Sequence, residues 1–270
     1  MSAAAQTDVA AGSATAGVPT LEIAGRRATI RLNRPRHLNR IEPVDLGELV
    51  RLLGRVDADP DLRVLVITGT GRAFSAGYHL GDLAERSPDA PPATDSFEAM
   101  VDRLEAVRVP TIARLQGGVY GGATDLALAC DFRIGHEGIE MVMPAGRLGV
   151  HYYASGLRRY VSRLGLNTAK RLFLTAERLD AAELARIGYL TQPPVDATAL
   201  DAAVDALADR LAAMAPLAVQ GMKRALNEIG HGALDTEAVA RRAALCKDSA
   251  DLREGLAAFR ERREPVFQGR

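Results

Sequence analysis

Apolar and polar residues alternate along two short segments that begin near position 20. In Leu21–Ile23 and Ala28–Leu32, apolar side chains recur at every second position on either side of the turn residue Gly25. A two-residue period is typical of a β-strand that buries one of its faces. The pattern therefore predicts a β-hairpin near the start of the folded chain.

The following patterns predict a helix and then alternating strands and helices. Apolar residues recur at helical spacing at Leu46, Leu49, Val50, Leu53 and Val56. Arg63–Thr68 is a mostly apolar, β-branched run, which predicts a strand covered on both faces. Ser96–Val107 has a helical pattern, and Thr111–Leu115 and Phe132–Ile134 predict two further strands. This alternation of strands and helices predicts parallel pairing and an α/β fold.

Shifts in composition divide the chain into three parts. Residues 1–18 are rich in Ala, Ser, Gly and Thr without a basic start, which predicts a disordered leader that carries no targeting signal. Residues 19–196 carry the strand and helix patterns and are predicted to form the βα core. Residues 197–270 show repeated Ala and Leu periodicity, which predicts a helical C-terminal region.

Charge and cysteine content exclude several classes of protein. The chain of 270 residues has 34 Lys and Arg against 34 Asp and Glu, so no net field favours nucleic acid or an anionic membrane. No apolar run approaches the roughly 18 residues of a membrane span. The two cysteines, Cys130 and Cys246, are too few for a disulfide framework or a four-cysteine zinc site. We therefore expect a cytoplasmic protein with neither a nucleic-acid partner nor a membrane partner.

Common catalytic motifs are incomplete in this chain. Gly69–Gly71 begins like a dinucleotide fingerprint, but Phe74 stands where its third glycine belongs. Ala73–Gly77 lacks the first glycine of a nucleophile elbow, so a structural role is expected for Ser75. The five histidines show no paired spacing, and we expect no metal site.

Two glycine-bearing segments remain as candidates. Ser75–Tyr78 and Gly117–Gly122 each offer a backbone amide beside a glycine at the end of a predicted strand. Glycine permits close approach of the backbone to a ligand. Two such amides that converge on one carbonyl oxygen would form an oxyanion hole.

Three ordered blocks carry a family resemblance. Gly71–Leu80, Gly117–Asp131 and Met143–Gly149 resemble the signature blocks of the crotonase, or enoyl-CoA hydratase/isomerase, superfamily. The likeness extends from about Leu21 to Arg270. It implies an α/β fold built as a spiral of ββα units with a helical C-terminal region that completes trimers, or pairs of trimers, and the CoA site. It also implies a CoA-thioester substrate, with no cofactor beyond that CoA.

The resemblance assigns the oxyanion hole to the amides of Tyr78 and Gly122. Family hydratases that resemble this chain carry two glutamates that hold and deprotonate water, and here these positions are Asp125 and Ala145. Aspartate keeps a carboxylate, whereas alanine cannot transfer a proton. Asp125 is therefore either the remaining acid or base or a first-turn residue that stabilises a helix start.

Further side chains are candidates for chemistry. His79, beside the oxyanion residue, is either a proton carrier or part of the wall of the CoA channel. Tyr153 stands where some relatives place an extra carboxylate. Tyr153 and the nearby His151 either position water or substrate or fill space. Tyr120 is expected to line the pocket.

The resemblance also implies a set of CoA contacts. Arg36 suits a phosphate group, and Phe267 matches a family position that approaches adenine in a neighbouring subunit. The full set of predicted CoA-binding residues is Arg36, His37, Leu38, Ala76, Tyr78, Leu80, Gly121, Lys223 and Phe267.

Several activities stay open at this point. Enoyl-CoA hydratase/isomerase chemistry is the first expectation. The loss of one glutamate also fits an isomerase with a single carboxylate, or a C–C hydrolase or decarboxylase of the same fold. A CoA-binding pseudoenzyme without turnover is the remaining alternative.

Overall fold

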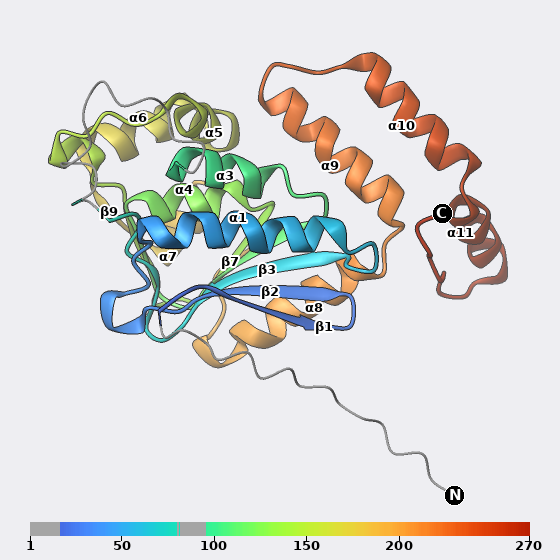
Figure 1. The fold of residues 1–270 in the computed structure, drawn as a ribbon, viewed down its shortest axis with the longest axis horizontal. Helices are drawn as coiled ribbons and strands as arrows, with labels where there is room; N and C mark the ends of the chain where they lie inside the picture. The colour runs from blue at the N-terminus through green and yellow to red at the C-terminus, as the bar shows by residue number, and fades with distance from the viewer. Residues whose placement is uncertain (1–16, 80, 82–95) are drawn as a thin grey trace, which may run out of the picture.

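The computed structural model describes residues 17–79, 81 and 96–270. Most of the predicted leader, residues 1–16, and the predicted CoA contact Leu80 lie outside these residues. The described chain forms two β-sheets covered by helices (Figure 1).

Strands that follow one another along the chain are distributed over the two sheets. The larger sheet has the order β1 (Thr20–Ala24), β2 (Arg27–Leu32), β3 (Val64–Gly69), β5 (Thr111–Leu115) and β7 (Phe132–Gly135). The smaller sheet has the order β4 (Ala73–Ser75), β6 (Gly118–Tyr120), β8 (Glu140–Val142) and β9 (Arg178–Asp180). In the pairs β3–β4, β5–β6 and β7–β8 the first strand joins the larger sheet and the second joins the smaller one, whereas β1 and β2 both lie in the larger sheet. The chain therefore winds as the predicted spiral of ββα units.

Strand directions agree with the sequence patterns. β1 and β2 pair antiparallel as the predicted hairpin, and β2, β3, β5 and β7 pair in parallel. The helices are α1 (Pro43–Ala58), α3 (Phe97–Glu105), α4 (Gly122–Ala129), α5 (Ala154–Leu164), α6 (Leu166–Thr175), α7 (Ala181–Arg186), α8 (Leu200–Ala212), α9 (Pro216–Gly230), α10 (Thr236–Asp248) and α11 (Ala250–Glu261). Short 3-10 helices lie at Pro35–His37, Ala145–Leu148 and Ala197–Ala199.

Helix α1 shows how local sequence positions an element. It begins with a reciprocal capping box between Glu42 and Asp45, with Pro43 in its first turn, as expected of a helix start. Its buried residues include Leu46, Leu49, Leu53 and Val56. The predicted apolar stripe is therefore the face that α1 packs on the sheet.

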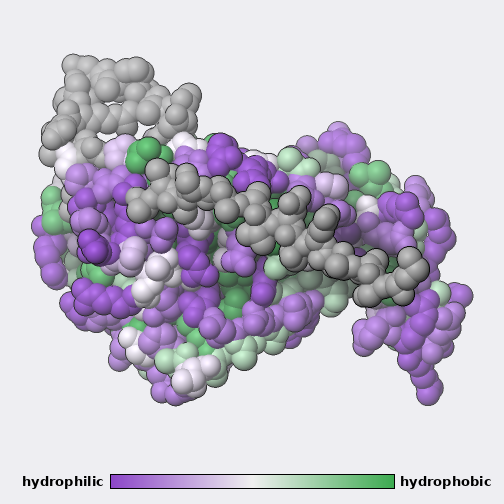
Figure 2. All heavy atoms as spheres, turned by 60° about the horizontal axis from the view of Figure 1, so that its bottom comes forward, coloured by the Kyte–Doolittle hydropathy of each residue, from purple (hydrophilic) through white to green (hydrophobic). Residues whose placement is uncertain are grey.

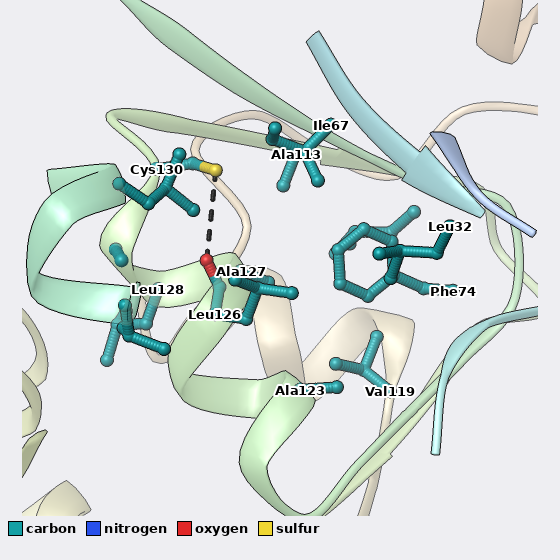
Figure 3. Close-up of a cluster of buried hydrophobic side chains, with 14 of the residues drawn as sticks. Leu32, Ile67, Phe74, Ala113, Val119, Ala123, Leu126, Ala127, Leu128 and Cys130 are labelled. Carbon is teal, nitrogen blue, oxygen red and sulfur yellow. Dashed lines mark hydrogen bonds between the residues drawn. The ribbon is translucent and has the colours of Figure 1, made fainter. Parts of the chain in front are cut away.

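The larger sheet is covered on both faces. Leu65 and Ile67 of β3 join the main core with α1, α3 and α4, whereas Val64 and Val66 pack against α8. Figure 3 shows part of the main core, where Ile67 faces α4. This arrangement confirms the prediction of a doubly covered strand.

Helices α9–α11 extend away from the two sheets (Figure 1). They leave large apolar side chains exposed: Met222 is 58% exposed, Leu226 67%, Leu245 65% and Phe259 84%.

The face in Figure 2 is mostly hydrophilic, with hydrophobic residues gathered in smaller patches. Helix α8 lies within the predicted C-terminal region, yet it packs on the larger sheet through Val204 and Leu207.

Candidate active site

Two loops meet at one edge of the smaller sheet. β4 and β6 pair in parallel, so the chain leaves Ser75 and Tyr120, the last residues of these strands, at the same edge. The first loop carries Tyr78, and the second leads into α4, which begins at Gly122. A methyl carbon built on Gly122 would lie 3.5 Å from the Tyr78 nitrogen. The structure therefore brings the two predicted backbone segments together.

Glycine is needed where these loops touch. Gly77 has a φ of +84°, and a methyl carbon built on it would lie 2.7 Å from both the Gly122 nitrogen and the Tyr120 oxygen. A side chain would strain the backbone and separate the loops. The Ser75 hydroxyl donates to the Asn39 carbonyl at 2.7 Å and accepts from the Gly77 N–H at 3.0 Å. Ser75 therefore holds the loop, in the structural role expected for it.

The Gly122 N–H lies in the first turn of α4, where helix amides lack intrahelical acceptors. In the part of the chain that the structure describes, this N–H donates to no acceptor. The helix macrodipole adds partial positive charge at the same end. This end of α4 is therefore suited to an oxygen atom that carries negative charge.

Asp125 follows Gly122 by three residues on α4 and is fully buried. Its Oδ2 accepts hydrogen bonds from the Tyr153 hydroxyl at 2.5 Å and from Arg159 Nη1 at 2.7 Å. Its Oδ1 is buried without a hydrogen-bond partner among the described residues. A buried carboxylate oxygen without a donor is costly, which is typical of a site that a ligand or water completes.

Burial raises the pKa of Asp125 because the charged carboxylate loses water. The positive charge of Arg159 and the hydrogen bond from Tyr153 oppose this shift, but burial outweighs them. The raised pKa moves Asp125 towards the range in which a carboxyl group can both take and give a proton.

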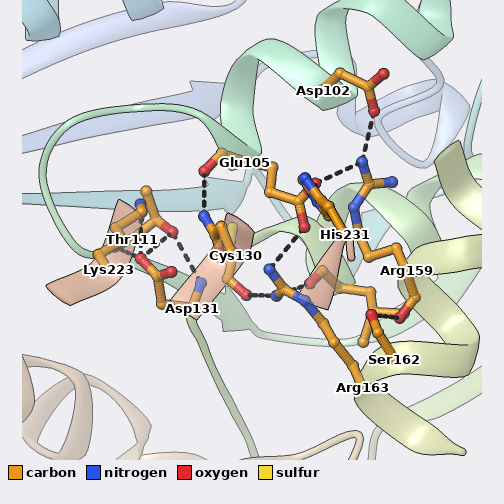
Figure 4. Close-up of polar contacts among 12 residues, drawn as sticks. Asp102, Glu105, Thr111, Cys130, Asp131, Arg159, Ser162, Arg163, Lys223 and His231 are labelled. Carbon is orange, nitrogen blue, oxygen red and sulfur yellow. Dashed lines mark hydrogen bonds and ion pairs between the residues drawn. The ribbon is translucent and has the colours of Figure 1, made fainter. Parts of the chain in front are cut away.

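Arg159 of α5 is the centre of a buried ion cluster (Figure 4). Its side chain is 1% exposed and pairs with Asp125 at 2.7 Å, Asp102 at 2.6 Å and Glu105 at 3.1 Å. Burial lowers the pKa of Arg159, but the facing carboxylates outweigh burial and raise it. Arg159 is therefore a permanent positive charge. It fixes one oxygen of Asp125 and leaves the other unpartnered.

Tyr153 joins Asp125 to a row of aromatic rings. Its ring stacks on Tyr152 at a centroid distance of 4.4 Å and meets Phe97 edge-on at 6.3 Å, and Phe97 lies 5.5 Å from Tyr78. Burial and the facing Asp125 carboxylate raise the pKa of the Tyr153 phenol. Tyr153 therefore keeps its proton and acts on Asp125 as a hydrogen-bond donor.

The remaining chemical candidates are His79, His151, Tyr120 and Ala145. His79 Nδ1 is 3.4 Å from a Glu42 carboxylate oxygen, at the start of α1. His151 is exposed. The Tyr120 hydroxyl donates to Glu140 at 2.7 Å. Ala145 is buried at the start of a 3-10 helix after β8.

The predicted CoA contacts in the first half of the chain lie beside the Tyr78 loop. The Ala76 N–H donates to the Leu38 carbonyl at 2.7 Å, and Arg36 and His37, next to Leu38, are exposed. Gly121 has a φ of +55°, a conformation that glycine adopts readily. The chain therefore has the cationic Arg36 close to the loop that carries the candidate amide.

Two predicted CoA contacts lie on the C-terminal helices and the tail. Lys223 Nζ pairs with Asp131 at 2.8 Å and donates to the Val109 carbonyl at 2.8 Å, with its side chain only 8% exposed. Both of these Lys223 contacts are therefore internal to the chain, and its role as a phosphate ligand stays a prediction. Phe267 packs near Gly255 and lines a groove of about 580 Å³ between α9, α10 and α11.

Sequence reasoning missed Arg159, Glu105 and Phe97. A signal for Arg159 was present, because Ser155 and Arg159 are four residues apart on the inner face of an amphipathic helix. The described residues contain no cluster of three or more His, Cys, Asp or Glu able to hold a metal. Among the same residues, no helix is both long and apolar enough to cross a bilayer.

Comparison with known proteins gives consistent results. Residues 23–270 match the family model for enoyl-CoA hydratase/isomerase. The chain is 33% identical over 247 residues to a probable enoyl-CoA hydratase of Mycobacterium bovis, covering 91% of this chain and 95% of that protein. It is 32% identical to the 2,3-dehydroadipyl-CoA hydratase of Escherichia coli, over 89% of this chain and 94% of that one. An enoyl-CoA hydratase structure from Bacillus anthracis superposes with a TM-score of 0.83 at 28% identity, covering 93% and 99% of the two chains.

These matches span nearly the whole chain. The protein belongs to the enoyl-CoA hydratase/isomerase family, as the signature blocks predicted. The crotonase-like fold class is likewise confirmed.

Proposed function

We propose that this protein forms and protonates the enolate of an acyl-CoA thioester, with Tyr78 and Gly122 amides as the oxyanion hole and Asp125 as the single acid/base group. The observation that carries the proposal is the buried, unpartnered Oδ1 of Asp125, one helical turn from Gly122. An enolate oxygen between the two amides would place the adjacent carbon near α4. Removal of one oxyanion donor typically lowers a rate by about 100- to 1000-fold.

One carboxylate supports a proton shift better than a two-carboxylate water addition. Ala145 offers no proton-transfer group, whereas Asp125 Oδ1 could take a proton from one carbon of the substrate and return it to another. Double-bond isomerisation is therefore the reaction that the residues favour. Hydration is the second candidate, and the relatives named as hydratases favour it.

The proposed CoA path runs along the first loop. Arg36 and His37 would face the nucleotide, and Leu38 and Ala76 would border the pantetheine arm. Exposed apolar residues on α9–α11 support association into the trimers, or pairs of trimers, implied by the family resemblance. A partner subunit's Phe267 would then complete the adenine site. The chemistry needs no cofactor beyond the CoA of the substrate.

Product analysis tests the proposed reaction. The protein is incubated with 2-enoyl-, 3-enoyl-, dienoyl- and oxoacyl-CoA thioesters, and the products are identified by mass and NMR. A moved double bond without change of mass is expected. A gain of one water would favour hydration, and loss of a carbon fragment would favour cleavage. Binding without turnover across the set would contradict the proposal and indicate a pseudoenzyme.

Gly77→Ala is expected to lower kcat by about 100- to 1000-fold, because the new methyl group would force apart the loops that hold the two amides. Steady-state kinetics measures this effect. Gly165→Ala is the matched control, since Gly165 has a similar φ of +82° but no atom within 4 Å of the added carbon. A similar loss of activity in both variants would show that backbone strain alone is responsible.

A further inference from the structure

Glu105 is connected to the candidate site through Arg159, which pairs with both Glu105 and Asp125. It is the last residue of α3, and its side chain is 6% exposed. Its Oε2 pairs with Arg159 at 3.1 Å, and its Oε1 pairs with Arg163 at 2.9 Å. Figure 4 shows Glu105 beside Arg159. Since Arg159 also binds Asp125, an unbroken chain of buried charges joins Glu105 to the proposed acid/base group.

Helix α9 holds Glu105 from the opposite side. Three polar residues at four-residue intervals bind the core: Lys223 and Asn227 of α9, and His231 at the C-cap of α9. Asn227 donates to the Glu105 carbonyl at 3.1 Å, and His231 Nε2 lies 3.0 Å from Glu105 Oε2. Glu105 is therefore fixed through both its backbone and its carboxylate.

We propose that Glu105 is a positioning residue for the reaction: it holds Arg159, so that Arg159 turns Asp125 Oδ2 away and leaves Oδ1 to the substrate. The proposal rests on the acid/base role of Asp125 proposed above. Without Glu105, the carboxylate partners that Arg159 would keep among the described residues are Asp125 and the partly exposed Asp102. The positive charge of Arg159 would then act on Asp125 without the opposing negative charge of Glu105.

The charges around Glu105 determine the sign of its effect. Arg159 and Arg163 face it from α5, His231 faces it from the C-cap of α9, and Asp102 precedes it by one turn on α3. Burial alone would raise the pKa of Glu105, but Arg159 and its other cationic partners outweigh burial and lower it, so Glu105 is charged. That negative charge acts to raise the pKa of Asp125, which Arg159 acts to lower. Neutral glutamine at position 105 should therefore lower the pKa of Asp125.

The test compares Glu105→Gln with the unchanged protein in two measurements. Infrared titration follows the protonated carboxyl band of Asp125, assigned as the band that Asp125→Asn removes. We expect its midpoint to fall by about half a pH unit or more. We also expect kcat to fall about tenfold with KM unchanged, because Asp125 is less well placed. The acid limb of the rate profile should move to lower pH with the infrared midpoint.

Asp102→Asn is the matched control. It removes a carboxylate from the same Arg159 nitrogen, but Asp102 is 41% exposed and water screens its charge. The midpoint of the Asp125 infrared titration should therefore hardly move. An unmoved midpoint in Glu105→Gln, or equal shifts in both variants, would overturn the proposal. If Glu105→Gln does not fold, Glu105→Asp should show a smaller decrease in kcat, and an unchanged kcat there would overturn it too. The infrared shift needs no turnover, so a shift without any activity would contradict only the proposed function.

Discussion

Asp125→Asn is expected to lower kcat by about 100- to 10,000-fold, the range for loss of a general acid or base. Asparagine keeps the size of the side chain and an oxygen for Tyr153, but it cannot take up a proton. Arg159 retains Glu105 and Asp102 as partners, so the variant should remain folded. KM for the thioester should change little, because Asp125 is not among the proposed binding groups.

The pH profile gives a second check on Asp125. Because burial raises its pKa, the acid limb of kcat/KM should lie above the ordinary aspartate value of about 3.9. Activity should be present above that pKa and lost as pH falls through it, since the base must be ionised. Asp209→Asn, at an exposed position on α8, is the control and should retain full activity. Full activity in Asp125→Asn would refute the assigned role.

Arg159→Met is expected to reduce the free energy of unfolding by about 3–5 kcal/mol, as is typical when one partner of a buried ion pair is removed. The substitution would leave Asp125 and Glu105, whose side chains are 0% and 6% exposed, without their shared cation. Urea unfolding at fixed protein concentration measures the loss.

Arg158→Met is the matched control for Arg159→Met. Arg158 is the preceding residue of α5 but is exposed, so its replacement should change the free energy of unfolding by less than about 0.5 kcal/mol. Equal losses in the two variants would mean that the ion cluster contributes no specific stability.

Periodicity predicted the larger elements correctly. The hairpin, α1 and β3 are long enough for a two- or four-residue repeat to be visible, and β3 carries β-branched residues on both faces. Strands β4, β6, β8 and β9 have three residues each, too few for any period to be recognised. Their pairing is nevertheless what brings the Tyr78 and Gly122 loops to one edge.

Sequence reasoning found Asp125 and Tyr153 but not their contact or its supports. Asp125 and Arg159 are 34 positions apart, and Glu105 and His231 are 126 apart. Such contacts depend on how helices cross in the fold, which local patterns do not encode. The same reason explains why no local pattern predicted the pairing of Lys223 with Asp131.

A crystal structure of the protein with an unreactive acyl-CoA analogue would show whether the Tyr78 and Gly122 amides form an oxyanion hole beside Asp125. We expect the thioester oxygen about 3 Å from both the Tyr78 and the Gly122 nitrogens, with Asp125 Oδ1 beside the carbon next to the carbonyl. A thioester oxygen bound by neither amide, or an Asp125 carboxylate separated from that carbon by other side chains, would contradict the proposed function.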